Sequence, residues 1–213
     1  LTQGPFGPEL VNIVESGGVM EDAIGLPQVI SYIEAFIWRR QYRLVGSRAI
    51  LRETGMCSQL TQGGNADTRR YARYRCAGDG QFRCLLMTCL IALHDTSDGE
   101  GSFCLVPGSH KASLPHPYRG RDLEKISPLR EISLRAGCGV LYTEGLSYAF
   151  KATGQSQSWL LYQYGPSYMV NWPGCEPSAE LRARTRGAEI KSHLLLDPYY
   201  HPIGSQGKKN KIV

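Results

Sequence analysis

Apolar residues fall at helical spacing near the start of the chain and at strand-like spacing through most of the remaining residues. Between Pro27 and Trp38 they recur three or four positions apart behind a proline in the first turn, which predicts a helix with one buried face. Arg43–Arg52 alternates between apolar and polar residues, so we expect a strand there. Leu10–Gly18 fits either a short helix or a short strand.

From Phe82 onward the pattern is one of short strands separated by turn residues. Five apolar runs bounded by glycine, serine or proline are predicted strands: Phe82–Leu93, Ser102–Val106, Glu131–Leu134, Gly139–Thr143 and Trp159–Tyr164. Short strands behind a helix indicate a mainly β fold with flanking helices, a β-sandwich or jelly roll. Ser178 followed by an early acid predicts the start of one more short helix.

The composition suits one ordinary globular domain. The chain has 213 residues, 42% of them apolar, and a net charge of +5. This positive excess is mild and comes with no stacking motif or recognition helix, so we expect a solvated basic face and no nucleic-acid partner. No apolar run approaches the length of a membrane span, so we expect peripheral membrane association only through protein partners.

The seven cysteines indicate free thiols. Their number is odd and no two form a C-x-x-C pair, so we expect neither a disulfide framework nor a zinc site. Three of them lie in apolar runs and should pack as small hydrophobes: Cys84, Cys89 and Cys104. A reducing intracellular compartment fits best. Because the chain begins at Leu1 rather than Met, an organelle such as a mitochondrion or plastid, reached after removal of a targeting peptide, is the expected location.

One segment carries a family resemblance. Between Asp95 and Lys111 an acidic turn, a glycine step and an apolar strand lead into Pro107-Gly108-Ser109-His110-Lys111, which resembles the signature of the phytanoyl-CoA dioxygenase family. Leu134–Gly137 followed by Val140–Glu144 resembles a second block of that family. The resemblance implies a double-stranded β-helix (a jelly roll, cupin-like). Active members of the family use Fe(II), 2-oxoglutarate and oxygen to hydroxylate small molecules or acyl-CoA esters.

The resemblance also suggests how one domain is divided. Residues 1–57 are expected to form a layer of helix and strand that packs on the barrel. Residues 58–172, which carry the family-like blocks, are the expected jelly-roll core. Residues 173–213 would contribute a C-terminal helix and an extended basic tail.

Against the family pattern, this chain departs at the metal and co-substrate positions. Family members hold iron with two histidines and a carboxylate, the first two ligands in an H-x-D pair. No H-x-D or H-x-E occurs here: Gln62 and Gly64 take the positions of the pair, and Tyr148 takes that of the second histidine. Trp159 stands where an arginine would grip the far carboxylate of 2-oxoglutarate. We therefore expect no metal and no cofactor, with Tyr148 and Trp159 filling the old pocket.

The other polar candidates have plainer explanations. His110 closes a Pro-Gly-Ser turn and is expected to be structural, and His116 between two prolines is expected at the surface. His94 beside Asp95 at a strand end is expected to form a solvated or tautomer-fixing pair. A hard cation held by oxygen ligands is a minor alternative, because the spacing of its candidate ligands matches no known loop: Gln62, Asn65, Asp67 and Glu144.

These departures favour a non-catalytic structural or accessory subunit of a larger assembly. Tyr168 and Trp172 are candidate interface anchors. Because the family includes non-catalytic subunits of organellar membrane complexes, a respiratory or photosynthetic complex is the expected host. Two alternatives stay open. One is an active Fe(II)/2-oxoglutarate dioxygenase acting on a small molecule or acyl-CoA, with His94 or His193 folded into the site; the other is a metal-free small-molecule binding module.

Overall fold

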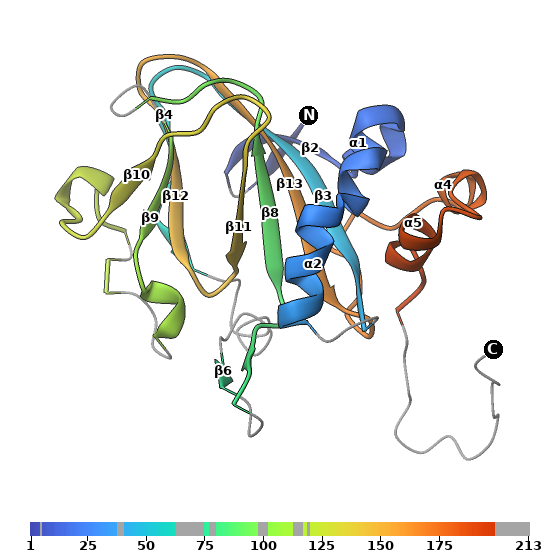
Figure 1. Ribbon diagram of the computed structural model, residues 1–213. Helices are drawn as coiled ribbons and strands as arrows, with labels where there is room; N and C mark the ends of the chain where they lie inside the picture. The colour runs from blue at the N-terminus through green and yellow to red at the C-terminus, as the bar shows by residue number, and fades with distance from the viewer. Residues whose placement is uncertain are drawn as a thin grey trace.

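Two antiparallel sheets face each other in the computed structural model (Figure 1), which describes residues 1–4, 6–37, 41–62, 75–76, 80–97, 102–112, 117–118 and 120–198. The larger sheet has six strands in the order β1 (Thr2–Gly4), β2 (Gly7–Val11), β3 (Tyr42–Arg52), β13 (Gln157–Pro166), β8 (Met87–Ala92) and β11 (Gly139–Thr143). The smaller sheet follows the order β10 (Arg130–Ile132), β9 (Phe103–Val106), β12 (Ser147–Ala152) and β4 (Met56–Cys57), and β5 (Thr61–Gln62) also pairs with β12. A separate hairpin joins β6 (Arg75–Cys76) to β7 (Phe82–Arg83).

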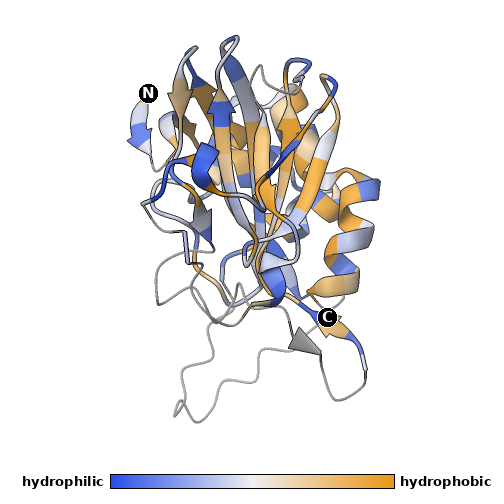
Figure 2. Ribbon diagram, turned by 90° about the vertical axis from the view of Figure 1, so that its left-hand side faces the viewer, coloured by the Kyte–Doolittle hydropathy of each residue, from blue (hydrophilic) through white to orange (hydrophobic). Residues whose placement is uncertain are grey.

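The strand order is that of a double-stranded β-helix, which confirms the predicted fold class. Going along the chain, β3, β8, β11 and β13 belong to the larger sheet, whereas β4, β9, β10 and β12 belong to the smaller one. The chain therefore passes repeatedly from one sheet to the other and encloses a space between them. Hydrophobic residues concentrate in these strands (Figure 2).

β13 supplies side chains to two separate cores, because successive residues along a strand point to opposite faces of the sheet. Trp159 and Leu161 point between the sheets, where they join Phe103, Phe150 and Ile50. Leu160, Tyr162 and Tyr164 point to the outer face and join a second cluster formed with the helices.

Helices cover the outer face of the larger sheet. η1 (Ile13–Ser16), α1 (Gly18–Asp22), η2 (Ala23–Gly25) and α2 (Pro27–Phe36) precede β3, and α2 buries Ile30 and Ile33 against the sheet. The hydroxyl of Tyr162 donates to the Met20 carbonyl at 3.0 Å, and that of Tyr164 donates to the Ile24 carbonyl at 2.9 Å. These bonds satisfy the polar tips of two tyrosines that are otherwise buried with apolar neighbours. No helix in the described part of the chain is long and apolar enough to cross a membrane.

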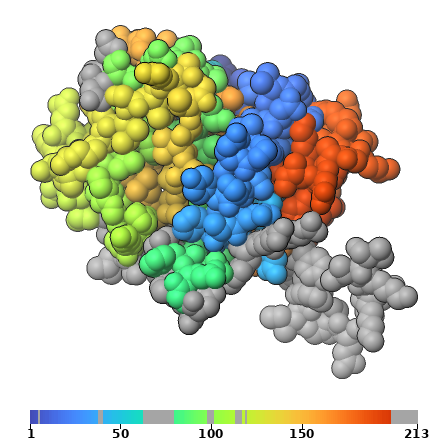
Figure 3. Space-filling view, viewed as in Figure 1, coloured from blue at the N-terminus to red at the C-terminus, as the bar shows by residue number. Residues whose placement is uncertain are grey.

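Two short helices near the C-terminus pack beside the N-terminal ones, as Figure 3 shows for the orange-red and blue atoms. α4 (Ala179–Arg184) begins at Ser178, whose hydroxyl accepts from the Leu181 amide at 3.0 Å, which confirms the predicted N-cap. α5 (Glu189–Leu194) comes next along the chain. Glu21 of α1 pairs with Arg184 at 2.8 Å and with Lys191 at 2.9 Å, so the first and last helices are joined by charge as well as by apolar contact.

Several sequence predictions are confirmed and two are corrected. The helix behind Pro27 and the strand Gly139–Thr143 have the expected places. Phe82–Leu93 is not one strand, because the chain leaves the sheet between β7 and β8, where the Cys84 amide donates to the Phe36 carbonyl. Residues 42–52, assigned to a layer outside the barrel, form β3 in the middle of the larger sheet.

Four of the described cysteines are buried. Three of them are the ones expected from their apolar sequence context, Cys84, Cys89 and Cys104, and the fourth is Cys175. Burial raises the pKa of Cys84 to about 12 and that of Cys89 and Cys104 to about 11. These thiols are therefore neutral at physiological pH and behave as small hydrophobic side chains.

Arg43 in β3 is a buried cation that is satisfied mainly by carbonyl groups. Its guanidinium donates to the Met169 carbonyl at 2.7 Å, to the Leu196 carbonyl at 2.7 and 3.0 Å, and to Asn171 Oδ1 at 2.8 Å. Burial lowers the pKa of Arg43 to about 10, so it remains charged at neutral pH. The side chain thereby holds the segment after α5 and the segment after β13 to the central sheet.

Replacing Arg43 by methionine should destabilise the fold by about 3 kcal/mol, because three acceptors, one of them in a buried hydrogen bond, lose their charged donor. Urea unfolding measures the loss, and hydrogen exchange should speed up first in α4 and α5. Arg130→Met is the matched control, since Arg130 is exposed and bonds only to carbonyls close to it in the chain; its effect should stay within about 0.5 kcal/mol. Equal effects of the two variants would contradict this role for Arg43.

Candidate functional site

The structure places Gln62 and Tyr148, two of the predicted metal-ligand positions, on neighbouring strands but on opposite faces of the smaller sheet. β5 pairs with β12 so that Gln62 lies opposite Ser147, and Thr61 lies opposite Tyr148. The two side chains therefore come from neighbouring strands at the same end of the sandwich. Gly64, the third predicted position, lies outside the described residues.

Gln62 links two turns at this end of the molecule. Its Nε2 donates to the Ser109 carbonyl at 3.4 Å and to the Gly145 carbonyl at 3.2 Å. Ser109 begins η3 (Ser109–Lys111), which is part of the family-like motif, and Gly145 lies in the turn between β11 and β12. The motif residues Pro107 to Lys111 thus form a turn at the candidate site, and the Ser109 hydroxyl accepts from the Ser147 amide at 2.8 Å.

Tyr148 is buried among aromatic rings. It is 2% exposed, and its ring lies 4.9 Å from Tyr142, 5.6 Å from Phe103 and 5.6 Å from Phe6, measured between centroids. Burial, together with a smaller effect from the neighbouring charge of Glu144, raises the pKa of Tyr148 well above its usual range. The phenol is therefore strongly held in its neutral form, which is a poor metal ligand.

Glu144, which the sequence suggests only as a minor candidate ligand for a hard cation, points into the same interior. Its carboxylate accepts a hydrogen bond from Thr88 Oγ1 and another from Gln163 Nε2 at 3.1 Å. Burial raises the pKa of Glu144, although the hydrogen bonds from Thr88, Gln163 and Tyr148 act in the opposite direction. The turn position and the motif spacing do not reveal on which face of the sheet this side chain lies, so its burial has no signal in the sequence.

Trp159 occupies the middle of the barrel. It is fully buried, and its ring lies 4.9 Å from that of Phe150. Phe150 in turn contacts Phe103 and Phe6, so a continuous aromatic cluster runs from Trp159 to Tyr148. The prediction that Tyr148 and Trp159 point inward agrees with this arrangement.

A pocket of about 480 Å³ opens beside α2 and β11. Its wall comes from α2, β8, β9, η3, β11 and the turn after β11, and it is mainly apolar: Tyr32, Phe36, Met87, Leu105, His110, Val140, Leu141, Tyr142, Thr143 and Leu146. Figure 3 shows the blue atoms of α2 on the same face of the molecule as the yellow and green atoms of β11 and η3. His110 and Leu146 each come directly after a residue whose carbonyl accepts from Gln62, so the pocket adjoins the metal-ligand position.

His110 is the ionisable imidazole of this pocket. It is half-buried, and burial, with a smaller contribution from the charge of Lys111, lowers its pKa below the usual 6.5. The imidazole is therefore neutral at physiological pH and presents one hydrogen-bond donor and one acceptor. The turn role predicted for His110 and a place in the pocket wall are both observed.

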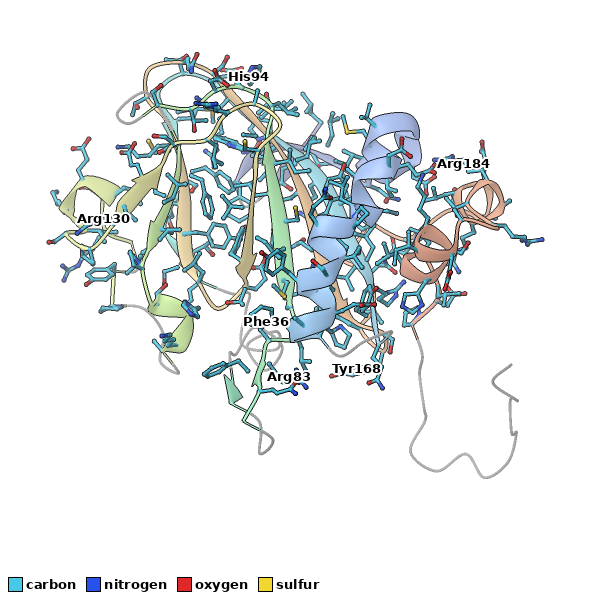
Figure 4. All side chains as sticks on the ribbon, viewed as in Figure 1. Phe36, Arg83, His94, Arg130, Tyr168 and Arg184 are labelled. Atoms are coloured by element: carbon cyan, nitrogen blue, oxygen red, sulfur yellow. The ribbon has the colours of Figure 1, made fainter. Side chains whose placement is uncertain are left out.

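Two histidines considered as relocated ligands lie elsewhere. His94 is exposed at the opposite end of the sandwich from Phe36, a residue of the pocket wall (Figure 4). His193 lies on α5, with its ring 5.2 Å from that of Tyr42 on the helical side of the larger sheet. Neither can join Gln62 and Tyr148. His116, Asn65 and Asp67 lie outside the described residues.

The two proposed interface residues differ in exposure. Tyr168 is 47% exposed, and Figure 4 places it at the lower edge of the molecule, close to the end of β13. Trp172 is half-buried against Val45, Leu86 and Met169. A Cβ atom at Gly46 would lie 2.5 Å from the Trp172 ring, so this glycine is required for the close approach. The interface role of both residues stays a prediction.

The described residues do not fit iron(II) in the manner of a two-histidine, one-carboxylate site. No group of three or more His, Cys, Asp or Glu side chains converges among them. At the two described ligand positions stand an amide and a neutral phenol, Gln62 and Tyr148, and at the predicted co-substrate position stands Trp159. Any complete ligand set must therefore include residues beyond those described.

No protein-family model and no curated protein matches the sequence. The fold does match HygX from Streptomyces hygroscopicus with iron bound, over 82% of this chain and 78% of HygX, at a TM-score of 0.67 and 20% identity. HygX with nickel and 2-oxoglutarate bound matches at a TM-score of 0.67 and 21% identity, over 82% of this chain and 76% of that one.

A second match is SnoN, a non-haem alpha-ketoglutarate-dependent epimerase from nogalamycin biosynthesis. It covers 82% of this chain and 66% of its own, at a TM-score of 0.53 and 18% identity. The chain has the fold of non-haem 2-oxoglutarate-dependent enzymes. At this level of identity the likeness concerns the fold, and membership of the phytanoyl-CoA dioxygenase family stays a prediction.

These matches contradict the prediction of a non-catalytic accessory subunit. The same architecture carries iron and 2-oxoglutarate in HygX and serves as an epimerase in SnoN. Gln62 and Tyr148 depart from the usual ligands, and that departure does not carry the conclusion that the chain is inactive. For the same reason the expectation of no cofactor loses its support.

Glu144→Gln should stabilise the protein progressively as the pH rises above about 4.5, the usual pKa of a glutamate. Because the folded-state pKa is raised, wild-type stability falls between pH 4.5 and the folded-state pKa, whereas the amide has no charge to bury. The gain is about 1.4 kcal/mol for each unit by which the pKa is raised.

Chemical unfolding of both proteins at pH 4 and pH 8 measures this difference. Glu131→Gln is the matched control, because Glu131 is only partly buried and pairs with Lys151 at 2.6 Å. A difference between Glu144→Gln and wild type that does not change with pH would show that Glu144 is not an unfavourably buried charge.

Proposed function

We propose that the chain is an iron(II)/2-oxoglutarate-dependent enzyme that oxidises a small, mainly apolar organic molecule. The observation that supports this best is the position of the pocket. It has the size of a small-molecule site, it is lined mostly by apolar side chains, and it adjoins the strands that bear the metal-ligand positions in this fold. The matches to HygX and SnoN support the reaction class.

The described residues would serve substrate binding. Phe36, Leu105 and Leu141 offer apolar contact and exclude water from the bound molecule. The neutral imidazole of His110 can donate to or accept from one polar group of that molecule, which would fix its orientation. A mainly apolar substrate with one hydrogen-bonding group suits this wall better than an acyl-CoA ester, whose phosphates need cations.

The metal ligands require a separate test, because the described residues do not complete the set. In the sequence, Asp67 is the first acidic residue after Gln62. We assign it as the carboxylate ligand to be tested.

Purified protein kept anaerobic should bind one equivalent of Fe(II), and on admission of oxygen it should convert 2-oxoglutarate to succinate. Asp67→Asn should lower Fe(II) affinity by at least tenfold, since loss of a carboxylate ligand weakens a divalent metal site. Asp122→Asn is the control, because Asp122 is exposed and pairs with Lys125 at the surface. Absence of Fe(II) and 2-oxoglutarate binding in the wild-type protein would overturn the proposed function.

Filling the pocket should separate substrate binding from metal binding. Leu141→Trp places an indole where the substrate would lie, so substrate stimulation of succinate formation should fall at least tenfold. Fe(II) affinity should be unchanged. Val170→Trp, at a side chain that is 69% exposed, is the matched control. Unchanged stimulation in Leu141→Trp would show that the substrate binds elsewhere.

A further inference from the structure

The N-terminal hairpin carries a carboxylate into the barrel. β1 and β2 extend the larger sheet beyond β3, and Glu9 lies opposite Ile50, whose side chain belongs to the interior cluster. Glu9 is fully buried, and its Oε2 accepts from Arg48 Nη1 at 2.8 Å. Its other oxygen accepts from the Phe6 amide at 3.4 Å. A charged side chain therefore occupies a position where an apolar one would be expected.

Two guanidinium groups face this single carboxylate. Arg48 and Arg52 are four residues apart on the face of β3 that also bears Ile50, so Glu9 enters between them. The charge of Glu9 acts on Arg52 as well, and burial lowers the pKa of Arg52. Arg52 is 4% exposed, and in the described structure the Nε of each arginine is buried without a hydrogen-bond partner.

This arrangement leaves donor capacity unused at a buried site. A guanidinium group has five N–H donors that suit bidentate binding of carboxylates. One carboxylate cannot satisfy two such groups, and the next acid in the interior, Glu144, is already bonded to Thr88 and Gln163. Two guanidinium groups turned inward around one carboxylate therefore have the composition of a binding site for a ligand with more than one carboxylate.

The same hairpin also covers the metal-ligand position. The ring of Phe6 lies 5.6 Å from that of Tyr148 and 5.1 Å from that of Phe150. The Glu9 carboxylate thus lies at Arg48, and the Phe6 ring of the same hairpin lies at Tyr148. A short dicarboxylate lying there would occupy the space of both side chains.

The hairpin is attached to the barrel by few backbone contacts. β2 pairs with β3 at three positions, and β1 pairs with β2 alone. In contrast, β13 pairs with β3 at ten positions. Gly4 closes over the carboxylate, because a Cβ atom there would lie 2.0 Å from the Glu9 carboxyl carbon. Movement of residues 6–11 away from β3 would break three strand pairs and remove Phe6 from the aromatic cluster, and it would leave the pairing of β3 with β13 intact.

We propose that Arg48 and Arg52 form an internal binding site for a short dicarboxylate, that Glu9 occupies this site as a built-in competitor, and that the ligand binds when the hairpin moves away. This extends the proposed function, since 2-oxoglutarate is a dicarboxylate, but it does not depend on the metal. It assigns the carboxylate-binding role to β3, in place of the position on β13 where Trp159 stands.

The test uses glutarate, a five-carbon dicarboxylate without the keto group that chelates a metal, on the full chain in the presence of EDTA. Glu9→Gln removes the competing charge while keeping the shape of the side chain. In calorimetry the variant should bind glutarate at least tenfold more tightly than wild type. The reason is that glutarate no longer has to displace the Glu9 carboxylate from the two arginines before it can bind. Glutarate should also restore much of the thermal stability that the variant loses. Adding Arg52→Gln to this variant should abolish both effects.

A purely stabilising ion pair predicts a different result. In that case Glu9→Gln is less stable than wild type and glutarate neither binds nor restores its stability, which would overturn the proposal. Glu131→Gln is the matched control, since it removes the carboxylate of another ion pair that lies outside the barrel interior. Acetate, a monocarboxylate, is the control for general anion binding. Equal binding of acetate and glutarate would also overturn the proposal.

A second measurement covers the case in which Glu9→Gln does not fold. In wild-type protein, saturating glutarate should increase hydrogen exchange at the amides of residues 6–11 and leave β13 unchanged. Protection of those amides by glutarate, or no change, would contradict hairpin displacement. These experiments contain no metal, so they test the glutarate site independently of the proposed function. A negative glutarate result would not contradict iron-dependent turnover, and absence of turnover would not contradict glutarate binding.

Discussion

The long strand β13 is the element on which both halves of the structure depend. It pairs with β3 at ten positions on one side and with β8 at six on the other, so it is hydrogen-bonded along most of both edges. One of its faces builds the helix-covered core, and the other builds the barrel interior. Pairing on both edges fixes the register of this strand, and the register in turn fixes which side chains, Trp159 and Gln163 among them, point into the barrel.

The barrel interior has an aromatic region and a charged region, and each limits what can bind. Tyr148, Phe150 and Trp159 fill the space near the smaller sheet. On the side of the larger sheet, Arg48, Arg52 and Glu9 enter from β3 and the hairpin. An apolar molecule is therefore better accommodated in the pocket beside α2 and β11, whose wall includes Leu105, Tyr142 and Leu146 from the edge of the interior cluster. The interior suits a charged ligand, and only when side chains of the hairpin leave it.

Some elements of the fold could be predicted from the sequence and others could not. The helix behind Pro27 and the strand β11 are predictable from clear periodicity. The family resemblance singled out Gln62 and Tyr148, but only the structure shows that they lie on neighbouring strands. β12, which bears Tyr148, was not predicted. Its residues are buried on both faces, because Leu123 and Ile126 cover Ala149, and a strand covered on both sides does not alternate.

The charged interior could not be predicted for a related reason. Glu9 and Arg48 occupy positions that a pattern assigns to solvent, yet the Glu9 side chain is fully buried and that of Arg48 is only 18% exposed, because the two pair across neighbouring strands. α5 is six residues long and has no side-chain cap, so it carries too little periodicity to be recognised. Pairing across the fold decided all of these features, and a single sequence does not record such pairing.

The pairing of β3 with β13 has a consequence for folding during synthesis on the ribosome. These strands lie on the order of 100 residues apart in the chain, so β3 can pair with β13 only after the intervening residues have been made. During synthesis at roughly 5–20 residues per second, β3 must wait several seconds for its partner to leave the ribosome. Over that interval its apolar face is exposed, so newly made chains should depend on chaperones, and folding should be slow for a domain of this size.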